Sequence, residues 1–249
     1  MKTIDLNCDL GEGAGQDAVL MPLITSANIA CGEHAGDEST MRATVALALR
    51  HGVAIGAPPG FADRENFGRK ERPITPAEAG KLVLTQLRRL QDIAAPMGAA
   101  VRHVKLHGAL YNQVSRDRPL AEAVVAAIRT AGKHPVIYAL AGSELERAAR
   151  PWTDVLTVPE VFADRTYQRD GTLTPRSRPD ALIADAAMAV AQVRRMISAG
   201  VVQATDGTEV PINAGTVCVH GDGPHAVAFA RRLRQELQLA GITLAAPVP

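Results

Sequence analysis

The sequence carries almost no net charge. Its 27 basic and 26 acidic residues leave a formal net charge of +1 over 249 residues. Such a balance creates no strong electrostatic field, so we expect neither a nucleic acid nor an anionic membrane surface as a partner. Long apolar stretches are missing as well. No run reaches the ~18 uncharged apolar residues of a membrane span, and no apolar leader follows Met1, so we expect a cytoplasmic protein.

Cysteine is scarce, and a P-loop is absent. Cys8, Cys31 and Cys218 each lie in an apolar, strand-like run. An odd number of cysteines in such places predicts reduced, buried thiols rather than disulfides. A nucleophilic cysteine is the alternative, but no cysteine stands beside a histidine in a nucleophile-like turn. The sequence has no Gly-x-x-x-x-Gly-Lys-Ser/Thr element, so any ATP must be bound in another way.

Strand-like and helix-like segments alternate from end to end. Apolar residues three and four positions apart predict helices over residues 38–51, 76–95, 119–132, 183–199 and 224–240. Thr75-Pro76 followed by Glu78 has the pattern of a helix-capping box. Strands are expected between the helices, over residues 3–8, 27–31, 53–57, 103–107, 135–140, 157–162 and 216–220.

Repeated strand–helix units imply parallel strands joined by right-handed crossovers. About seven such units predict a single α/β domain over residues 1–249, a seven-stranded and slightly distorted (β/α) barrel. A doubly wound open sheet is the alternative. Residues 61–73 and 164–179 form loops long enough to cover or line a binding site. Asp206-Gly207, between β-prone residues, predicts a hairpin over residues 201–211.

Titratable side chains recur where the predicted strands end. The two densest segments are residues 5–13 and 26–37, and three later strands end in similar groups. The C-terminal ends of parallel strands meet on one face, where ligands bind, so we expect a shared active site there. The residues that indicate it are Asp9, Glu12, His34, Asp37, Lys105, His107, Glu160, Asp164, His220 and Asp222.

Other interpretations of these segments fit less well. Residues 5–16 begin like a calcium-binding loop, but Leu10 stands where glycine is needed and Gln16 where a bidentate glutamate is needed. A loose dinucleotide-binding spacing follows the first strand, yet Asp9 and Glu12 would face the pyrophosphate. A divalent metal remains open, because the rim offers histidine and aspartate ligands without a tight motif such as His-Glu-x-x-His.

A series of specific sequence blocks, in order, resembles the LamB/YcsF family over nearly the whole chain. The resemblance implies a barrel of the glycoside hydrolase/deacetylase type, in agreement with the strand count. The blocks are residues 4–13 (IDLNCDLGEG), 26–37 (SANIACGEHAGD), 53–57 (VAIGA), 63–69 (DRENFGR), 103–112 (HVKLHGALYN), 140–143 (LAGS), 160–165 (EVFADR), 170–177 (DGTLTPRS) and 217–222 (with CVHGD at its core).

The resemblance also implies an activity. Members form part of an ATP-dependent 5-oxoprolinase, which hydrolyses the lactam of 5-oxo-L-proline to L-glutamate with Mg-ATP as co-substrate and with two other subunits. Opening a stable cyclic amide needs a general base, a proton for the leaving nitrogen and stabilisation of the carbonyl oxygen.

Resemblance and strand-end position together nominate the site residues. Lys105, Arg165 and Arg176 are expected to pair with the substrate carboxylate or a phosphate. The catalytic candidates are Asp9, Glu12, His34 and His107. The candidates for substrate binding are Asn7, Asn28, Asp37, Lys105, Tyr111, Arg165, Arg176, His220 and Asp222.

The chain departs from the usual family pattern at three positions. Pro58 replaces a histidine, Glu33 replaces a phenylalanine, and Leu106 replaces a proline. Two rival functions therefore stay open. One is a metal-dependent deacetylase or amidohydrolase acting on a small amide or sugar, and the other is a degenerate subunit that binds without turnover.

Overall fold

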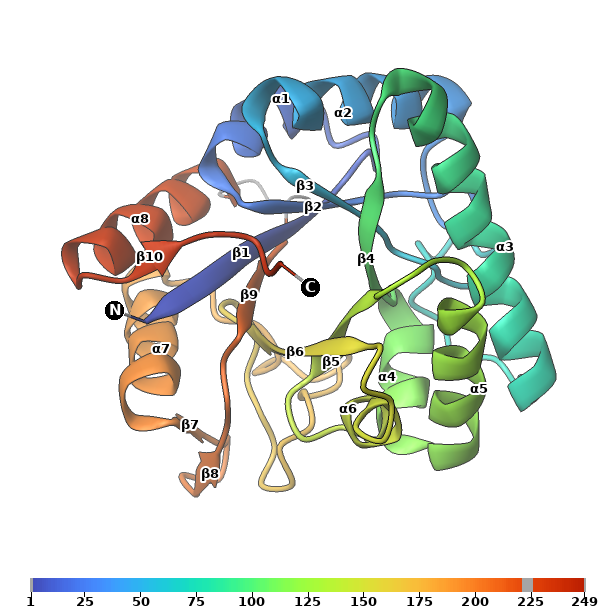
Figure 1. The fold of residues 1–249 in the computed structure, drawn as a ribbon. Helices are drawn as coiled ribbons and strands as arrows, with labels where there is room; N and C mark the ends of the chain where they lie inside the picture. The colour runs from blue at the N-terminus through green and yellow to red at the C-terminus, as the bar shows by residue number, and fades with distance from the viewer. Residues whose placement is uncertain (1, 221–225, 249) are drawn as a thin grey trace.

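Seven parallel strands close into a barrel in the computed structural model, which describes residues 2–220 and 226–248 (Figure 1). Each strand pairs with its neighbour, and the first pairs with the last to complete the ring. The (β/α) barrel prediction is thus confirmed, and the open sheet is excluded. The strands are β1 (Thr3–Leu10), β2 (Ser26–Ile29), β3 (Ala54–Ala57), β4 (Val101–Lys105), β5 (Val136–Leu140), β6 (Leu156–Phe162) and β9 (Thr216–Val219).

Helices surround the barrel (Figure 1). The capping box at the start of α3 is confirmed, because the Thr75 hydroxyl accepts from the Glu78 N–H and the Glu78 carboxylate accepts from the Thr75 N–H. The five predicted helices are α2 (Glu38–His51), α3 (Pro76–Ala94), α5 (Arg118–Arg129), α7 (Ala186–Ala199) and α8 (Ala226–Leu239). The predicted start of the last helix, at residues 224 and 225, lies outside the described residues.

Several short elements were not predicted. The helices α1 (Asp17–Leu20), α4 (Gly108–Arg116) and α6 (Glu144–Ala149) have too few turns to show a clear apolar period, and α4 begins where we expected a strand to end. Short 3-10 turns, η1 (Met21–Leu23) and η2 (Ala95–Met97), adjoin α1 and α3, and the strand β10 (Thr243–Leu244) pairs with the start of β1.

The long connection from β6 to β9 carries α7 and a hairpin. In this hairpin β7 (Val201–Gln203) pairs antiparallel with β8 (Glu209–Pro211), as predicted, and Gly207 has a φ of 86° in the turn. The hairpin extends beyond the helical layer (Figure 1). Within the described part of the chain, no helix is both long enough and apolar enough to cross a bilayer.

The barrel strands are apolar on the outside and polar on the inside. Alternate residues such as Leu6 and Leu10 of β1 are buried in the hydrophobic core. The interior of a β/α barrel is ordinarily filled by branched apolar side chains. Here the alternate strand positions carry buried polar groups instead, which must be satisfied by hydrogen bonds. They include Asp5, Asn7, Asp9, Ser26, Asn28, His103, Lys105, Glu160 and Thr216.

The three cysteines are buried and free, as predicted. Burial raises the pKa of the Cys31 thiol to about 12 and raises the pKa values of the other two thiols as well. Since a cysteine reacts as its thiolate, these three side chains are poor nucleophiles.

Candidate active site

The carboxylate of Asp9 is the central group at the C-terminal end of β1. Its Oδ1 accepts hydrogen bonds from Lys105 Nζ and Asn28 Nδ2, both at 2.9 Å, and its Oδ2 lies 3.3 Å from His107 Nδ1. Burial opposes ionisation of Asp9, but the charge of Lys105 outweighs it and holds the pKa of Asp9 well below its usual range. Asp9 is therefore an anion held by the Lys105 ammonium and the Asn28 amide.

Amides beneath Asp9 hold it in place. Asn28 Nδ2 donates both to Asp9 and to Asn7 Oδ1, and Asn7 Nδ2 donates to Glu160 Oε1 at 2.9 Å. The Asn28 oxygen accepts from His103 Nε2 at 2.8 Å, which fixes the tautomer of that ring. Asn7 and Asn28 are fully buried and engaged with other side chains. Our expectation of direct substrate contact by these two asparagines is therefore corrected to a supporting position below the site.

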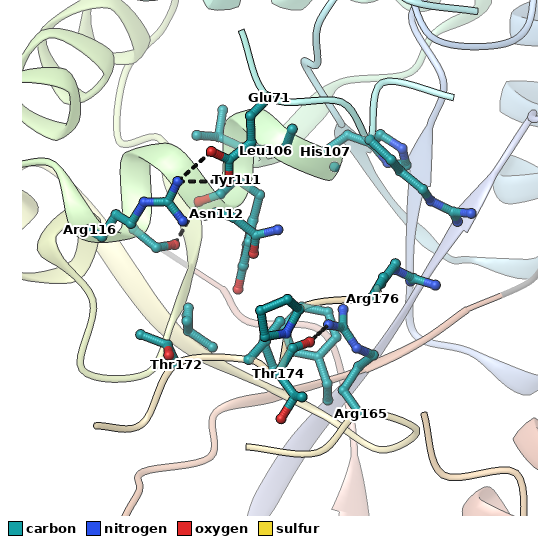
Figure 2. Close-up of a pocket in the computed structure, with 18 of the residues that line it drawn as sticks. Glu71, Leu106, His107, Tyr111, Asn112, Arg116, Arg165, Thr172, Thr174 and Arg176 are labelled. Atoms are coloured by element: carbon teal, nitrogen blue, oxygen red, sulfur yellow. Dashed lines mark hydrogen bonds and ion pairs between the residues drawn. The ribbon is translucent and has the colours of Figure 1, made fainter. Parts of the chain in front are cut away.

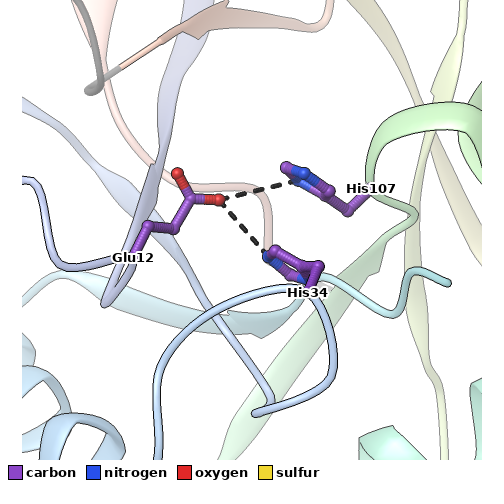
Figure 3. Close-up of side chains that lie close together, drawn as sticks. All are labelled: Glu12, His34 and His107. Atoms are coloured by element: carbon purple, nitrogen blue, oxygen red, sulfur yellow. Dashed lines mark ion pairs between the residues drawn. The ribbon is translucent and has the colours of Figure 1, made fainter. Parts of the chain in front are cut away.

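A second group, which we call the Glu12 cluster, consists of Glu12, His34 and His107 (Figure 3). The loop after β1 carries Glu12, the loop after β2 carries His34, and His107 precedes the first residue of α4. Glu12 Oε1 lies 3.3 Å from His34 Nε2 and 3.7 Å from His107 Nδ1. The imidazole rings stack in parallel, with centroids 3.9 Å apart. Three predicted catalytic residues thus meet at one point, and His107 also joins them to Asp9.

Two glycines allow the backbone to approach these rings. An added Cβ at Gly60 would lie 3.2 Å from the Cβ of His107, and one at Gly68 would lie 3.0 Å from the Cβ of His34. Gly68 also has a φ of 66°, which L side chains rarely adopt. The loop between β3 and α3, one of the two loops we expected to line a site, therefore packs directly against the histidines.

A cavity of about 650 Å³ opens beside Asp9, Lys105 and His107 (Figure 2). Its remaining walls come largely from the two long loops and from α4. Cationic side chains predominate in these walls, although Arg116 is neutralised by a two-oxygen ion pair with Glu71. The cationic side chains that line the cavity are Arg69, Lys105, Arg116, Arg165 and Arg176.

The wall formed by the loop after β6 concentrates positive charge. The Arg165 guanidinium is buried and donates to the backbone carbonyl of Thr174 at 2.6 Å. Burial and the nearby Arg176 lower the pKa of Arg165 to about 10, so Arg165 is charged at neutral pH. Guanidinium groups in one wall of the cavity favour an anionic ligand, because they pair with carboxylate and phosphate oxygens.

His220, at the end of β9, belongs to the same wall. An arginine can only donate, so Arg176 Nη2 donates to His220 Nε2 at 3.0 Å. The proton of the His220 ring is therefore on Nδ1, which lies 2.8 Å from Asp164 Oδ2. Burial of Asp164 opposes its ionisation, but His220 outweighs burial and lowers the pKa of Asp164. Tyr111 also lines the cavity, and burial raises the pKa of its hydroxyl, which stays protonated.

One predicted site residue lies away from this group. Asp37 is exposed and caps α2, where its side chain accepts from the Thr40 N–H, so the prediction that it lines the pocket is wrong. Asp222 lies outside the described residues. Glu33, which departs from the family pattern, lies 3.6 Å from Arg89 rather than in the Glu12 cluster. Pro58 is buried at the end of β3.

Some residues of the site were missed. His103 shares the inner barrel face with Lys105, two positions on, and this alternation could have revealed it. No strand alternation in the sequence points to Arg69 or Arg116, because a loop and an unpredicted helix bring them to the cavity.

The architecture defines the class of protein. A closed parallel β/α barrel with carboxylates, imidazoles and a buried ammonium at the C-terminal ends of its strands has the arrangement of a barrel enzyme. The profile of the LamB/YcsF family matches residues 4–249, and the chain belongs to this family.

Individual relatives cover almost the whole chain. It is 53% identical to the 5-oxoprolinase A subunit of Brevibacillus brevis, over 99% of this chain and 98% of that protein. It is 52% identical to the 5-oxoprolinase A subunit of Bordetella pertussis, over 98% of each. The crystal structure of the lactam utilization protein from Thermus thermophilus superposes with a TM-score of 0.90 at 40% identity, covering 99% of this chain and 100% of that one.

Proposed function

We propose that this chain is the subunit of an ATP-dependent 5-oxoprolinase in which the lactam of 5-oxo-L-proline is opened to L-glutamate. Mg-ATP is the co-substrate, and two other subunits complete the enzyme. The relatives named above support the subunit role. The observation that carries the proposal is the group formed by Asp9, Lys105 and His107, set beside a cavity with arginines in its wall.

The carbonyl carbon of a lactam is a weak electrophile, so transfer of the γ-phosphoryl group of ATP to the carbonyl oxygen, with release of ADP, speeds attack by water. That attack forms a C–O bond and breaks the ring C–N bond, which leaves an acyl phosphate. A second water then releases inorganic phosphate and L-glutamate. Arg165, Arg176 and His220 can then pair with the substrate carboxylate or with phosphate oxygens, as expected from the sequence.

The remaining groups supply the proton transfers. Glu12 Oε1 and the ring nitrogens of His34 are buried without hydrogen-bond partners, so either side chain can accept a proton from the attacking water. His107 can return a proton to the leaving nitrogen, and Lys105 places a fixed positive charge beside the reacting atoms. Asp9 has a lowered pKa and is a weak base, so its role here is to hold Lys105 in place.

Reconstitution tests the proposal. We expect this chain with its two partner subunits, 5-oxo-L-proline and Mg-ATP to form L-glutamate in step with ATP consumption. The chain alone should show little turnover, because its sequence has no P-loop. Glutamate formation at an undiminished rate by the partner subunits without this chain would refute the proposal, as would robust turnover by this chain alone.

A second function is favoured by one observation, the Glu12 cluster, whose residues have the chemistry of metal ligands. A metal-dependent amidohydrolase or deacetylase would cleave a small amide without ATP. Comparing amide hydrolysis with added metal but no nucleotide against the ATP-dependent reaction separates the two. A binding subunit without turnover would show 5-oxo-L-proline binding but no glutamate in either assay.

A further inference from the structure

The Glu12 cluster holds buried polar atoms that lack hydrogen-bond partners. Glu12 Oε1, both ring nitrogens of His34 and Nδ1 of His107 are in this condition, although the three side chains are at most 5% exposed. Each buried polar group without a partner costs about 1–3 kcal/mol, and native proteins retain few of them. Three of these atoms, Glu12 Oε1, His34 Nε2 and His107 Nδ1, lie close to one another and together indicate a ligand site.

The hydrogen bond on the far side of His107 shows what kind of ligand fits. His107 Nε2 lies 3.1 Å from the backbone carbonyl oxygen of Phe67, and a carbonyl can only accept, so Nε2 carries the proton. In the neutral ring the Nδ1 lone pair then faces the carboxylates of Glu12 and Asp9. This lone pair and the two carboxylates repel each other unless a cation lies between them. A backbone carbonyl that fixes the ring in this way is also typical of metal-binding histidines.

The cation is better supplied by a metal than by a second protonated imidazole. The two rings stack with centroids 3.9 Å apart, so two imidazolium charges would repel each other at close range. Asp9 and Glu12 place two buried carboxylates near Lys105, whose single ammonium contacts Asp9. A divalent ion would balance this charge and use the unpartnered atoms together.

We propose that Glu12, His34 and His107 bind a divalent transition-metal ion of the Zn²⁺ type. The candidate donor atoms lie within 4.8 Å of one another. Two imidazoles and one carboxylate are the donor set of catalytic zinc sites, which keep a further position for water or substrate. Imidazole donors disfavour Mg²⁺ and Ca²⁺, which prefer oxygen. The inference rests on the proposed function and changes one part of it: with the ion bound, Glu12, His34 and His107 would act as ligands, and the ion would activate water or polarise a carbonyl oxygen beside the cavity in their place.

Metal binding is measured directly on the purified chain. After chelator treatment and dialysis, Co²⁺ is titrated while its visible absorption is recorded, and Zn²⁺ is then added as a competitor. We expect one equivalent of Co²⁺ to bind with a ligand-field spectrum that Zn²⁺ abolishes. Glu12→Gln and His34→Gln should each weaken Co²⁺ binding by at least about 100-fold, since even outer partners of metal ligands are worth 10–100-fold. The matched controls Glu33→Gln and His51→Gln should bind as the wild type does.

A measurement on the unaltered protein covers the case in which a variant does not fold. In a crystal soaked with Zn²⁺, the anomalous difference peak should lie between Glu12, His34 and His107. Failure of the wild type to bind a stoichiometric ion, a peak elsewhere, or equal binding by folded ligand variants and controls would overturn the inference. Lactam hydrolysis is scored separately. ATP-dependent turnover that survives removal of bound transition metal, with Mg²⁺ supplied for the ATP, leaves the proposed function standing without the Glu12-cluster ion, and metal binding without turnover does the reverse.

Discussion

Replacing Lys105 by methionine should strongly destabilise the fold, and replacing Asp9 by asparagine in the same molecule should recover much of the loss. The two charges are 2.9 Å apart, with side chains that are 3% and 4% exposed. At an effective dielectric constant of about 20, their attraction is about 6 kcal/mol. Most of it offsets the desolvation of both groups, so the folded protein depends on the pair staying intact.

Removing one partner leaves the other charge buried. We expect Lys105→Met and Asp9→Asn each to lower the free energy of unfolding by about 3–5 kcal/mol, a large part of a typical total of about 5–15 kcal/mol. The double variant has neither charge and keeps similar shapes, so its loss should be well below the sum. The coupling free energy should be at least about 2 kcal/mol.

Urea denaturation of the wild type, both single variants and the double variant measures this coupling. A chelator in every sample prevents a bound ion from adding to stability. Additive effects, with a coupling below about 0.5 kcal/mol, would show that Asp9 and Lys105 do not form a buried pair in solution. The account of the site would then lose its central contact.

Three further predictions concern stability. Burial lowers the pKa of His103 from 6.5 to about 3. Below pH 6.5 the unfolded chain therefore binds a proton at this residue that the folded chain does not bind. The free energy of unfolding should fall by about 1.4 kcal/mol per pH unit in this range. Urea midpoints measured from pH 7 to pH 5 should therefore decrease more steeply for the wild type than for His103→Gln, and parallel curves would contradict this. Gly56→Ala would bring a Cβ within 2.0 Å of the His103 ring and should lower the free energy of unfolding by about 1–3 kcal/mol. The control Gly132→Ala has open space around its Cβ and should leave stability unchanged. Equal melting temperatures for the two variants would refute the clash. Thr75→Ala removes the α3 cap and should cost about 1 kcal/mol by the same assay, unless the capping contacts are absent in solution.

The barrel could be predicted from the sequence because its signals are local and repeated. Amphipathic helices such as α3 and α5 have regular apolar spacing, and strands such as β5 are short apolar runs between them. Short helices such as α4 were not predicted, because nine residues that begin at a polar strand end show too little of the helical apolar spacing.

The site could be predicted only in part. Strand-end position correctly brought Asp9, His34 and His107 together, because parallel strands deliver their ends to one face. The same rule misplaced Asp37, since a residue several positions beyond a strand has room to turn away and cap a helix. From the sequence, Asp9→Asn is expected to lower activity with little loss of stability, whereas the buried contact with Lys105 predicts a large stability defect. Such contacts join residues 96 positions apart and have no local signal.

The rate of L-glutamate formation by the reconstituted enzyme containing Asp9→Asn/Lys105→Met tests the central claim most directly. This double variant is expected to fold, so a defect in turnover would report on the site rather than on stability. We predict a loss of at least about 100-fold relative to wild type, the scale of positioned proton-transfer and electrostatic groups, while Glu33→Gln retains the wild-type rate. A folded double variant that forms glutamate as fast as the wild type would contradict the account and place lactam opening elsewhere.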